Sequence, residues 1–337
     1  MTIRLSSPRP SGYPRAASRR WLRAAHAAAV CVATLLIALT PASEAAIRFK
    51  RTGEATLGGP DALAGLPSVC EASGSYVWVD VEGRGECIAF YPTSGMVQAE
   101  QAVFYFEGDI PPDYRHNAAK LGAHLASMRR ALEKLAQTYK VPYAFVARPG
   151  TFGSTGNHAD RRKSREVLAM RAAVDAIRRR YGIRFASLAG QSGGATIVAG
   201  LLTLGIKDVR CATPASGGFD LNAMLDWHAQ RQGVVGSHRE HPATLAGSYN
   251  VMDGIAGVVR DPDRRVFVIG DANDKVTPFA QQKRFAERLK AQGHHVEIVE
   301  ATGAGPEHHG LSFFSLKLAG MCATGVADTE IQQAARR

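Results

Sequence analysis

The five residues Gly190-Gln191-Ser192-Gly193-Gly194 join a strand-like stretch of this sequence to a helix-like one. Residues 183–188 (IRFASL) before them are typical of a short buried strand, and the apolar residues 195–204 (ATIVAGLLTL) after them predict a packed helix. A sharp turn between a strand and a helix lifts its central side chain clear of the sheet, and flanking glycines make room for the strained backbone. Ser192 is therefore a candidate nucleophile; the alternative is a glycine-rich turn with an incidental serine.

A nucleophilic serine needs a base, and the base needs a carboxylate that orients it. The strand-like residues 265–269 (RVFVI) end in the loop 270–278 (GDANDKVTP), which carries Asp271 and Asp274. Carboxylates at the carboxyl end of a parallel strand are well placed for catalysis. Either aspartate is a candidate for the orienting acid, and both could instead be ordinary turn formers or helix caps.

The candidate base lies further along the chain. After a second strand at 296–299, a glycine-rich loop carries His308 and His309. Adjacent histidines cannot both face one serine, so one of them is only a neighbour in the loop. The chain order is serine, then acid, then histidine, which is one of the orders in which such triads occur.

These segments resemble those of the α/β-hydrolase superfamily of serine esterases and peptidases. The loop 270–278 is similar to the family's acid loop, with a proline four residues after the acid, and this resemblance selects Asp274 over Asp271. Residues 307–313 (EHHGLSF) resemble its histidine loop, in which the glycine that follows favours His309. The resemblance covers about residues 76–320 and implies a Ser-Asp-His triad; it says little about the substrate.

The family resemblance also implies an oxyanion hole made of two backbone N–H groups. One belongs to Gly193, the residue after the nucleophile. The other follows the strand-like residues 102–106 (AVFYF) and falls at Gly108 or Asp109. The loop 148–156 follows another strand and is expected at the same edge of the sheet. The alternative for both loops is an ordinary strand-ending turn.

The pattern of elements predicts one α/β catalytic domain over residues 76–337. Strand-like and helix-like segments alternate there, which implies a mostly parallel sheet covered by helices on both faces. Residues 117–139 and 161–181 have apolar residues at helical spacing. Residues 46–75 are expected to be an extended lead-in. Residues 218–262 form a longer insertion, either a small cap over the site or a segment packed on the core.

Residues 1–45 read as a cleaved export signal. Six arginines and a single acid accompany a 17-residue apolar run at 24–40, followed by small residues. The run is short for a membrane span, and no second apolar stretch of spanning length follows it; a retained N-terminal anchor is the alternative. Without residues 1–45, the chain has 35 basic and 29 acidic residues, so its net charge falls from +11 to +6. No basic patch with interleaved aromatic residues suggests nucleic acid.

Cysteine usage also indicates export to the periplasm or the medium. Cys31 lies in the signal, and four cysteines remain: Cys70, Cys87, Cys211 and Cys322. An even count in an oxidising compartment predicts two disulfides, with three possible pairings. We favour Cys70–Cys87, because these residues flank the first predicted strand hairpin. Four buried free thiols are the alternative.

The expected function is that of an exported serine hydrolase that cleaves carboxylic esters through Ser192, Asp274 and His309. Its substrate would be a small ester or acyl compound, and the chemistry requires no cofactor. A peptidase of the same fold, an acyl transferase and a non-catalytic binding protein are the alternatives. The spacing of His238 and His241 could suggest a metal pair, but no helical zinc motif accompanies it, so no metal is expected. The sequence leaves the oligomeric state open.

Overall fold

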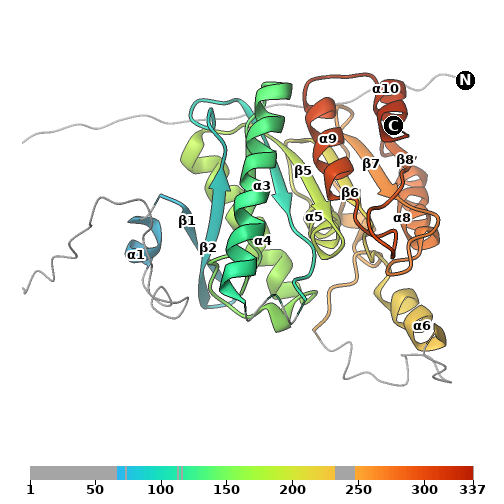
Figure 1. The fold of residues 1–337 in the computed structure, drawn as a ribbon, viewed down its shortest axis with the longest axis horizontal. Helices are drawn as coiled ribbons and strands as arrows, with labels where there is room; N and C mark the ends of the chain where they lie inside the picture. The colour runs from blue at the N-terminus through green and yellow to red at the C-terminus, as the bar shows by residue number, and fades with distance from the viewer. Residues whose placement is uncertain (1–66, 73, 112–113, 115–116, 232–246, 337) are drawn as a thin grey trace, which may run out of the picture. The chain divides into compact units, whose positions relative to one another are not determined.

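An eight-stranded sheet organises the chain, in the order β1-β2-β4-β3-β5-β6-β7-β8. The computed structural model describes residues 67–72, 74–111, 114, 117–231 and 247–336. Strand β2 is antiparallel to both of its neighbours, and every pair from β4 to β8 is parallel. The strands, which can be followed in Figure 1, are β1 (Tyr76–Val81), β2 (Arg84–Pro92), β3 (Gln101–Phe106), β4 (Tyr143–Val146), β5 (Phe185–Gln191), β6 (Val209–Ala215), β7 (Arg265–Gly270) and β8 (Val296–Glu300).

The central strands are buried on both faces, as an almost continuous apolar sequence requires. In β3 every residue except Gln101 is buried, and in β5 every residue except Phe185 is buried. The register pairs Phe106 with Gly190, at the carboxyl ends of β3 and β5. Because the parallel strands from β3 to β7 all end at this edge, the loops that follow them lie side by side. The predicted α/β sheet is confirmed.

Helices cover both faces of this sheet. Residues of α4, α5 and α8 share one apolar cluster with the sheet, while α3, α9 and α10 contribute to the clusters on the opposite face. Figure 1 shows α3 and α9 in front of the strands and α4 and α5 behind them. The longer helices are α3 (Ala118–Tyr139), α4 (Ser164–Tyr181), α5 (Gly193–Thr203), α6 (Leu221–Arg231), α8 (Phe279–Ala291), α9 (Ser312–Ala323) and α10 (Asp328–Ala335).

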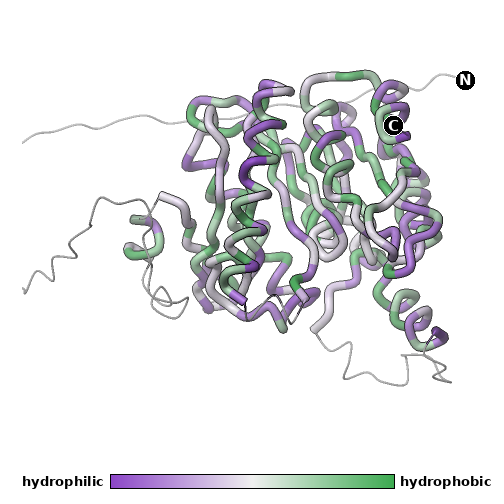
Figure 2. Tube along the Cα trace, viewed as in Figure 1, coloured by the Kyte–Doolittle hydropathy of each residue, from purple (hydrophilic) through white to green (hydrophobic). Residues whose placement is uncertain are grey.

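Helix α3 shows how the periodicity of the sequence becomes structure. The side chain of Asn117 caps it by accepting a hydrogen bond from the Lys120 amide (3.0 Å). Leu132 and Ala136, one turn apart, are buried against the sheet. Hydrophilic and hydrophobic stretches alternate along this helix in Figure 2, as expected for an element with one face in water.

Helix α4 begins at Ser164, three residues later than predicted. Residues His158–Asp160 form a separate turn of 3₁₀ helix, and Arg162 has a φ of +66°. A residue in this left-handed conformation cannot continue a right-handed helix. The helix therefore starts only after Lys163, which is extended.

Two disulfides link elements of the fold covalently. The favoured pair Cys70–Cys87 is present, and Cys211 on β6 is bonded to Cys322 on α9. Part of the predicted lead-in is wrong: Pro67–Ala72 forms the short helix α1, which the first disulfide fixes to β2. A further helix, α10, follows α9.

The described ends of the insertion 218–262 include residues that pack on the domain core. Phe219 stacks on Phe285 with ring centroids 4.5 Å apart, and Val251 and Ile255 belong to the same apolar cluster. Arg231, at the end of α6, donates to the carbonyl of Lys275 (2.9 Å). Phe219, Val251 and Ile255 therefore pack on the core, whereas α6 reaches the loop that carries Asp274.

The export signal 1–45 and the segment 46–66 lie outside the described residues, as do His238 and His241. None of the helices described here is sufficiently long and apolar to span a bilayer.

Candidate active site

The turn that carries Ser192 is strained and depends on its glycines. Ser192 has φ +55° and ψ −119°, and its amide donates to the carbonyl of Ala215 (2.8 Å). A Cβ at Gly190 would lie 2.4 Å from the carbonyl oxygen of Gly194, and a Cβ at Gly194 would lie 2.0 Å from that of Phe106. Neither position has room for a side chain. Helix α5 begins directly after Ser192, two residues earlier than predicted.

The structure brings Ser192, His309 and Asp274 into one hydrogen-bonded line. His309 Nε2 is 2.8 Å from Ser192 Oγ, and His309 Nδ1 is 2.9 Å from Asp274 Oδ2. The side-chain amide of Gln191 donates to the carbonyl of His309 (2.9 Å), which joins the histidine loop to the serine turn.

The environment of Asp274 favours its ionised form. Burial would raise the pKa of this carboxyl group, but hydrogen bonds from His309 and from the amides of Thr277 and Val276 outweigh it and lower the pKa. The hydroxyl of Thr277 also lies 3.0 Å from Asp274 Oδ2. A fixed carboxylate on Nδ1 leaves Nε2 of the neutral ring free to accept a proton from the serine.

A second aspartate–histidine pair lies beside the first. His308 Nδ1 is 3.1 Å from Asp271 Oδ2, which also accepts the amide of Gly303 (2.8 Å). Asp271 Oδ1 accepts the amide of Asn273 (2.8 Å). Burial would raise the pKa of Asp271, yet these hydrogen bonds lower it. The two aspartates and the two histidines therefore form two separate pairs, and of the two histidines only His309 is bonded to Ser192.

The candidate oxyanion amides lie at the first turn of α5 and after β3. The amide of Gly193 belongs to the first turn of the helix, where N–H groups have no intrahelical partner. The amide of Gly108 donates to Glu107 Oε1 (2.9 Å), so it is already engaged. The amide of Asp109 makes no hydrogen bond within the described residues. Of the two predicted residues, Asp109 therefore has the amide that is available to a ligand.

Gly108 has a different role, because it allows β3 and the serine turn to approach closely. A Cβ there would lie 2.8 Å from Gln191 Oε1 and 3.3 Å from the Cβ of Ser192. Glu107, just before it, also pairs with His124 (3.0 Å). That hydrogen bond is the main reason why the pKa of His124 is raised.

A charged network that the sequence did not predict fixes the side chain of Asp109. Arg148 is buried and donates to Asp109 Oδ1 (2.8 Å) and to Glu166 Oε1 (2.9 Å). Arg161 and Arg162 donate to Asp109 Oδ2 at 3.2 and 2.9 Å. Burial would raise the pKa of Asp109, but the three arginines hold it far below its ordinary value. The only sequence signal was the position of Arg148 in the loop predicted at the site's edge of the sheet.

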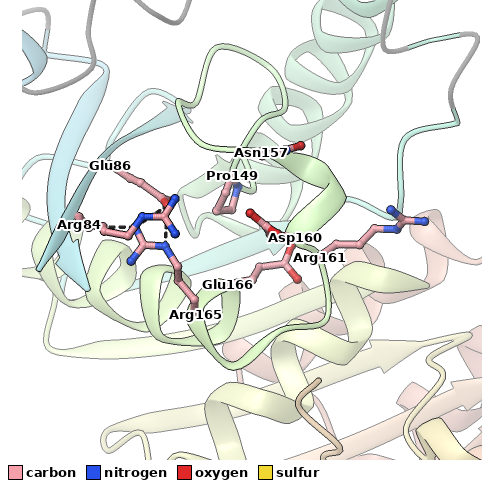
Figure 3. Close-up of a pocket in the computed structure, with 8 residues that line it drawn as sticks. All are labelled: Arg84, Glu86, Pro149, Asn157, Asp160, Arg161, Arg165 and Glu166. Carbon is pink, nitrogen blue, oxygen red and sulfur yellow. Dashed lines mark hydrogen bonds and ion pairs between the residues drawn. The ribbon is translucent and has the colours of Figure 1, made fainter. Parts of the chain in front are cut away.

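The pocket drawn in Figure 3 is lined by Arg161 and Glu166 of this network, and by none of Ser192, Asp274 and His309. Arg165 crosses it and pairs with Glu86 (2.7 Å), so ion pairs occupy much of its wall. In Figure 3 the guanidinium of Arg161 points away from the other labelled side chains.

One possible metal-binding group occurs among the described residues, formed by His295, Glu297 and Asp328. His295 is paired with Asp328 (2.6 Å), which also accepts a hydrogen bond from Arg265. These residues belong to β8, α10 and their surroundings, not to the serine turn.

Comparisons with known proteins identify the fold. No family model matches the sequence, and no curated protein matches it. An esterase from Pyrococcus furiosus is 14% identical over 76% of this chain and 92% of its own, with a TM-score of 0.50. Est1E from Butyrivibrio proteoclasticus is 12% identical over 74% of this chain and 98% of its own, with a TM-score of 0.48. An acylaminoacyl peptidase from Pyrococcus horikoshii is 14% identical over 78% of this chain and 42% of its own, with a TM-score of 0.46.

Proposed function

We propose that this chain, which has the α/β-hydrolase fold, is an exported serine hydrolase that cleaves carboxylic esters. One observation carries the proposal. A single imidazole, that of His309, lies within hydrogen-bond distance of both a serine hydroxyl (2.8 Å) and a buried carboxylate (2.9 Å). This is the geometry that activates a serine as a nucleophile.

In the proposed reaction, His309 takes the proton of Ser192 as Oγ attacks the acyl carbon of the ester. Asp274 holds the imidazole in the correct tautomer and stabilises its charged form. The amides of Gly193 and Asp109 bind the developing oxyanion. His309 then gives its proton to the leaving alcohol, and an acyl group remains on Ser192.

Water completes the cycle. His309 removes a proton from a water molecule, which attacks the acyl-enzyme, and the carboxylic acid leaves as Ser192 regains its proton. Peptidases of this fold often use a large cap or propeller to select peptides, whereas the insertion 218–262 is short. This difference, an analogy at the level of the fold, favours esters over peptides.

Export is part of the proposal. Two disulfides are typical of proteins that fold in oxidising compartments. The basic and apolar residues 1–45 would direct the chain there and be removed. An N-terminal sequence of the protein from its native compartment should begin near residue 46, and one that begins near Met1 would contradict this part of the proposal.

The function can be tested with a fluorophosphonate probe and a substrate panel. The probe should label Ser192 covalently, and mass spectrometry should find no label after Ser192→Ala. The wild type should hydrolyse short p-nitrophenyl esters faster than aminoacyl anilides. Label on another serine, or efficient cleavage of the anilides, would contradict the assignment or favour the peptidase.

A further inference from the structure

The charges around Asp109 do not balance. The network contains three guanidinium groups (Arg148, Arg161 and Arg162) and two carboxylates (Asp109 and Glu166), which leaves one excess positive charge. Among the described residues, the neighbouring acids each pair with another basic side chain: Glu86 with Arg165, Asp160 with Lys163, and Glu107 with His124, whose pKa this pairing raises.

The excess lies on Arg161 and Arg162. Arg148 is buried between its two carboxylates. The other two arginines share one oxygen atom, Asp109 Oδ2, and their side chains are 35% and 29% exposed. Each uses few of its five donors: Arg161 donates through Nε and NH1, and Arg162 through NH2. None of the described residues accepts a hydrogen bond from the remaining guanidinium donors, so an anion can bind them.

The two arginines lie beside the proposed reaction centre. A Cβ at Gly193 would lie only 2.1 Å from Asp109 Oδ1, so the carboxylate touches the first residue of α5. Arg161 and Arg162 bind the other oxygen of the same carboxylate. They are thus separated from Gly193, the neighbour of Ser192, by a single side chain.

The backbone of Arg162 is held in an unfavourable conformation. Its φ is +66°, although it is not glycine. Glu166 Oε2 accepts its amide (2.6 Å), and the amide of Tyr249 donates to its carbonyl (2.7 Å). Strain that is enforced from both sides is characteristic of ligand-binding positions.

We propose that Arg161 and Arg162 bind a carboxylate carried by the ester substrate, so that the enzyme prefers anionic esters to neutral ones. Arginine pairs a planar fork of donors with the two oxygens of a carboxylate, which suits this role. The inference rests on the proposed ester hydrolysis and adds the chemical class of the substrate.

The test compares pairs of esters in which one member carries a free carboxylate and the other carries the same carboxyl group as an ester. Monoethyl succinate is compared with diethyl succinate, and monoethyl adipate with diethyl adipate, to place the charge in the acyl part at two distances. The butyryl ester of glycolate and that of methyl glycolate place it in the alcohol part. Hydrolysis is followed by product release at low ionic strength, on the purified exported protein.

In the wild type, kcat/KM should favour the anionic member of at least one pair by about tenfold or more, the factor expected for one charge-assisted hydrogen bond. The ratio should fall as salt is added. It should approach one in Arg161→Gln/Arg162→Gln. Because each ratio is taken within one protein, a general loss of activity through Asp109 cancels. Arg179→Gln, which removes one positive charge from the exposed end of α4, is the matched control for each single variant, Arg161→Gln and Arg162→Gln, and should keep the wild-type ratio.

Each outcome decides between the two proposals. Ratios near or below one in the wild type, with the neutral esters turned over, would overturn the anion site and leave ester hydrolysis standing. A high ratio that survives in Arg161→Gln/Arg162→Gln, or in both single variants should the double variant not fold, would show that these arginines are not the site. Absence of any turnover together with absence of phosphonate label on Ser192 would overturn the proposed function itself.

Discussion

At the scale of single residues, the two adjacent histidines have different surroundings. His309 connects Ser192 to Asp274, whereas His308 connects its own loop to Asp271. Asp271 also holds the amide of Gly303, at the start of the histidine loop. The second pair therefore fixes the two loops to each other, and through them it positions His309.

This difference predicts unequal effects of substitution. His309→Ala should lower kcat by about three decades or more, because triad members act as a unit. His308→Ala should lower it by about tenfold to a hundredfold through misplacement of the loop. His308→Asn should recover most of this loss, since asparagine can donate to Asp271 and tolerates the φ of +54° found there.

Single-turnover rates of these three variants provide the measurement. An activity of His309→Ala close to the wild type, with a severe loss in His308→Ala, would reverse the two roles.

At the scale of elements, the junction between β5 and α5 tolerates no added atoms. A Cβ on Gly190 or Gly194 would come within 2.4 Å of backbone carbonyl oxygens that cannot move independently of the sheet. Gly122, in the exposed part of α3, is the opposite case, with nothing within 4 Å of its Cβ position.

Substitution by alanine should therefore lower the stability of the protein at Gly194 and raise it at Gly122. Gly194→Ala should destabilise the protein by about 2 kcal/mol or more, as overpacking in a rigid core does. Gly122→Ala should stabilise it by about 0.5–1 kcal/mol, because alanine is the better helix former. Urea unfolding of both variants checks the prediction, and an unchanged midpoint for Gly194→Ala would contradict the described turn.

The elements differ in how far the sequence predicts them. The apolar runs of β3, β5 and β7 and the periodicity of α3 are long and regular, so local patterns suffice. Helix α1 has six residues, and a disulfide to β2 holds it in place, which no local pattern reveals. The candidate triad follows from chain order because each member lies in a turn or loop that follows a strand. The sequence does not predict the role of Arg161 and Arg162, because they are more than fifty residues away from Asp109 in the chain and only the fold brings them into contact with it.

At the scale of the whole molecule, acid should unfold the protein through its paired carboxylates. The pKa values of Asp109, Asp271 and Asp274 are all lowered in the fold. An unfolded aspartate titrates near pH 3.9, so just below that pH the unfolded chain binds protons that the native chain still excludes. The stability that these groups contribute is fully present above about pH 4 and is lost as the pH falls toward their native pKa values.

The prediction can be checked with Asp109→Asn. Its free energy of unfolding, measured in urea between about pH 2.5 and 7, should fall less steeply below pH 4 than that of the wild type. An equal slope would mean that Asp109 does not contribute to the acid sensitivity.

The two disulfides should differ in their contribution to stability. Cys70–Cys87 spans 17 residues and Cys211–Cys322 spans 111. In the chain-entropy model these loops correspond to about 3 and about 5 kcal/mol. Replacing both cysteines of the longer pair by alanine should therefore lower the unfolding midpoint more, as measured in guanidinium chloride. Four alkylatable thiols in the denatured, unreduced protein would contradict both disulfides.

The positive φ of Ser192 has a consequence for anyone who evolves this protein in the laboratory. Glycine would relax the turn at this position, so Ser192→Gly should melt a few degrees above Ser192→Ala, about 2–4 °C for a domain of this size. A selection for heat resistance alone should accordingly enrich glycine at position 192 and yield inactive protein. Each round must therefore include an assay for turnover, because at this position the residue that raises the melting temperature removes the catalytic activity.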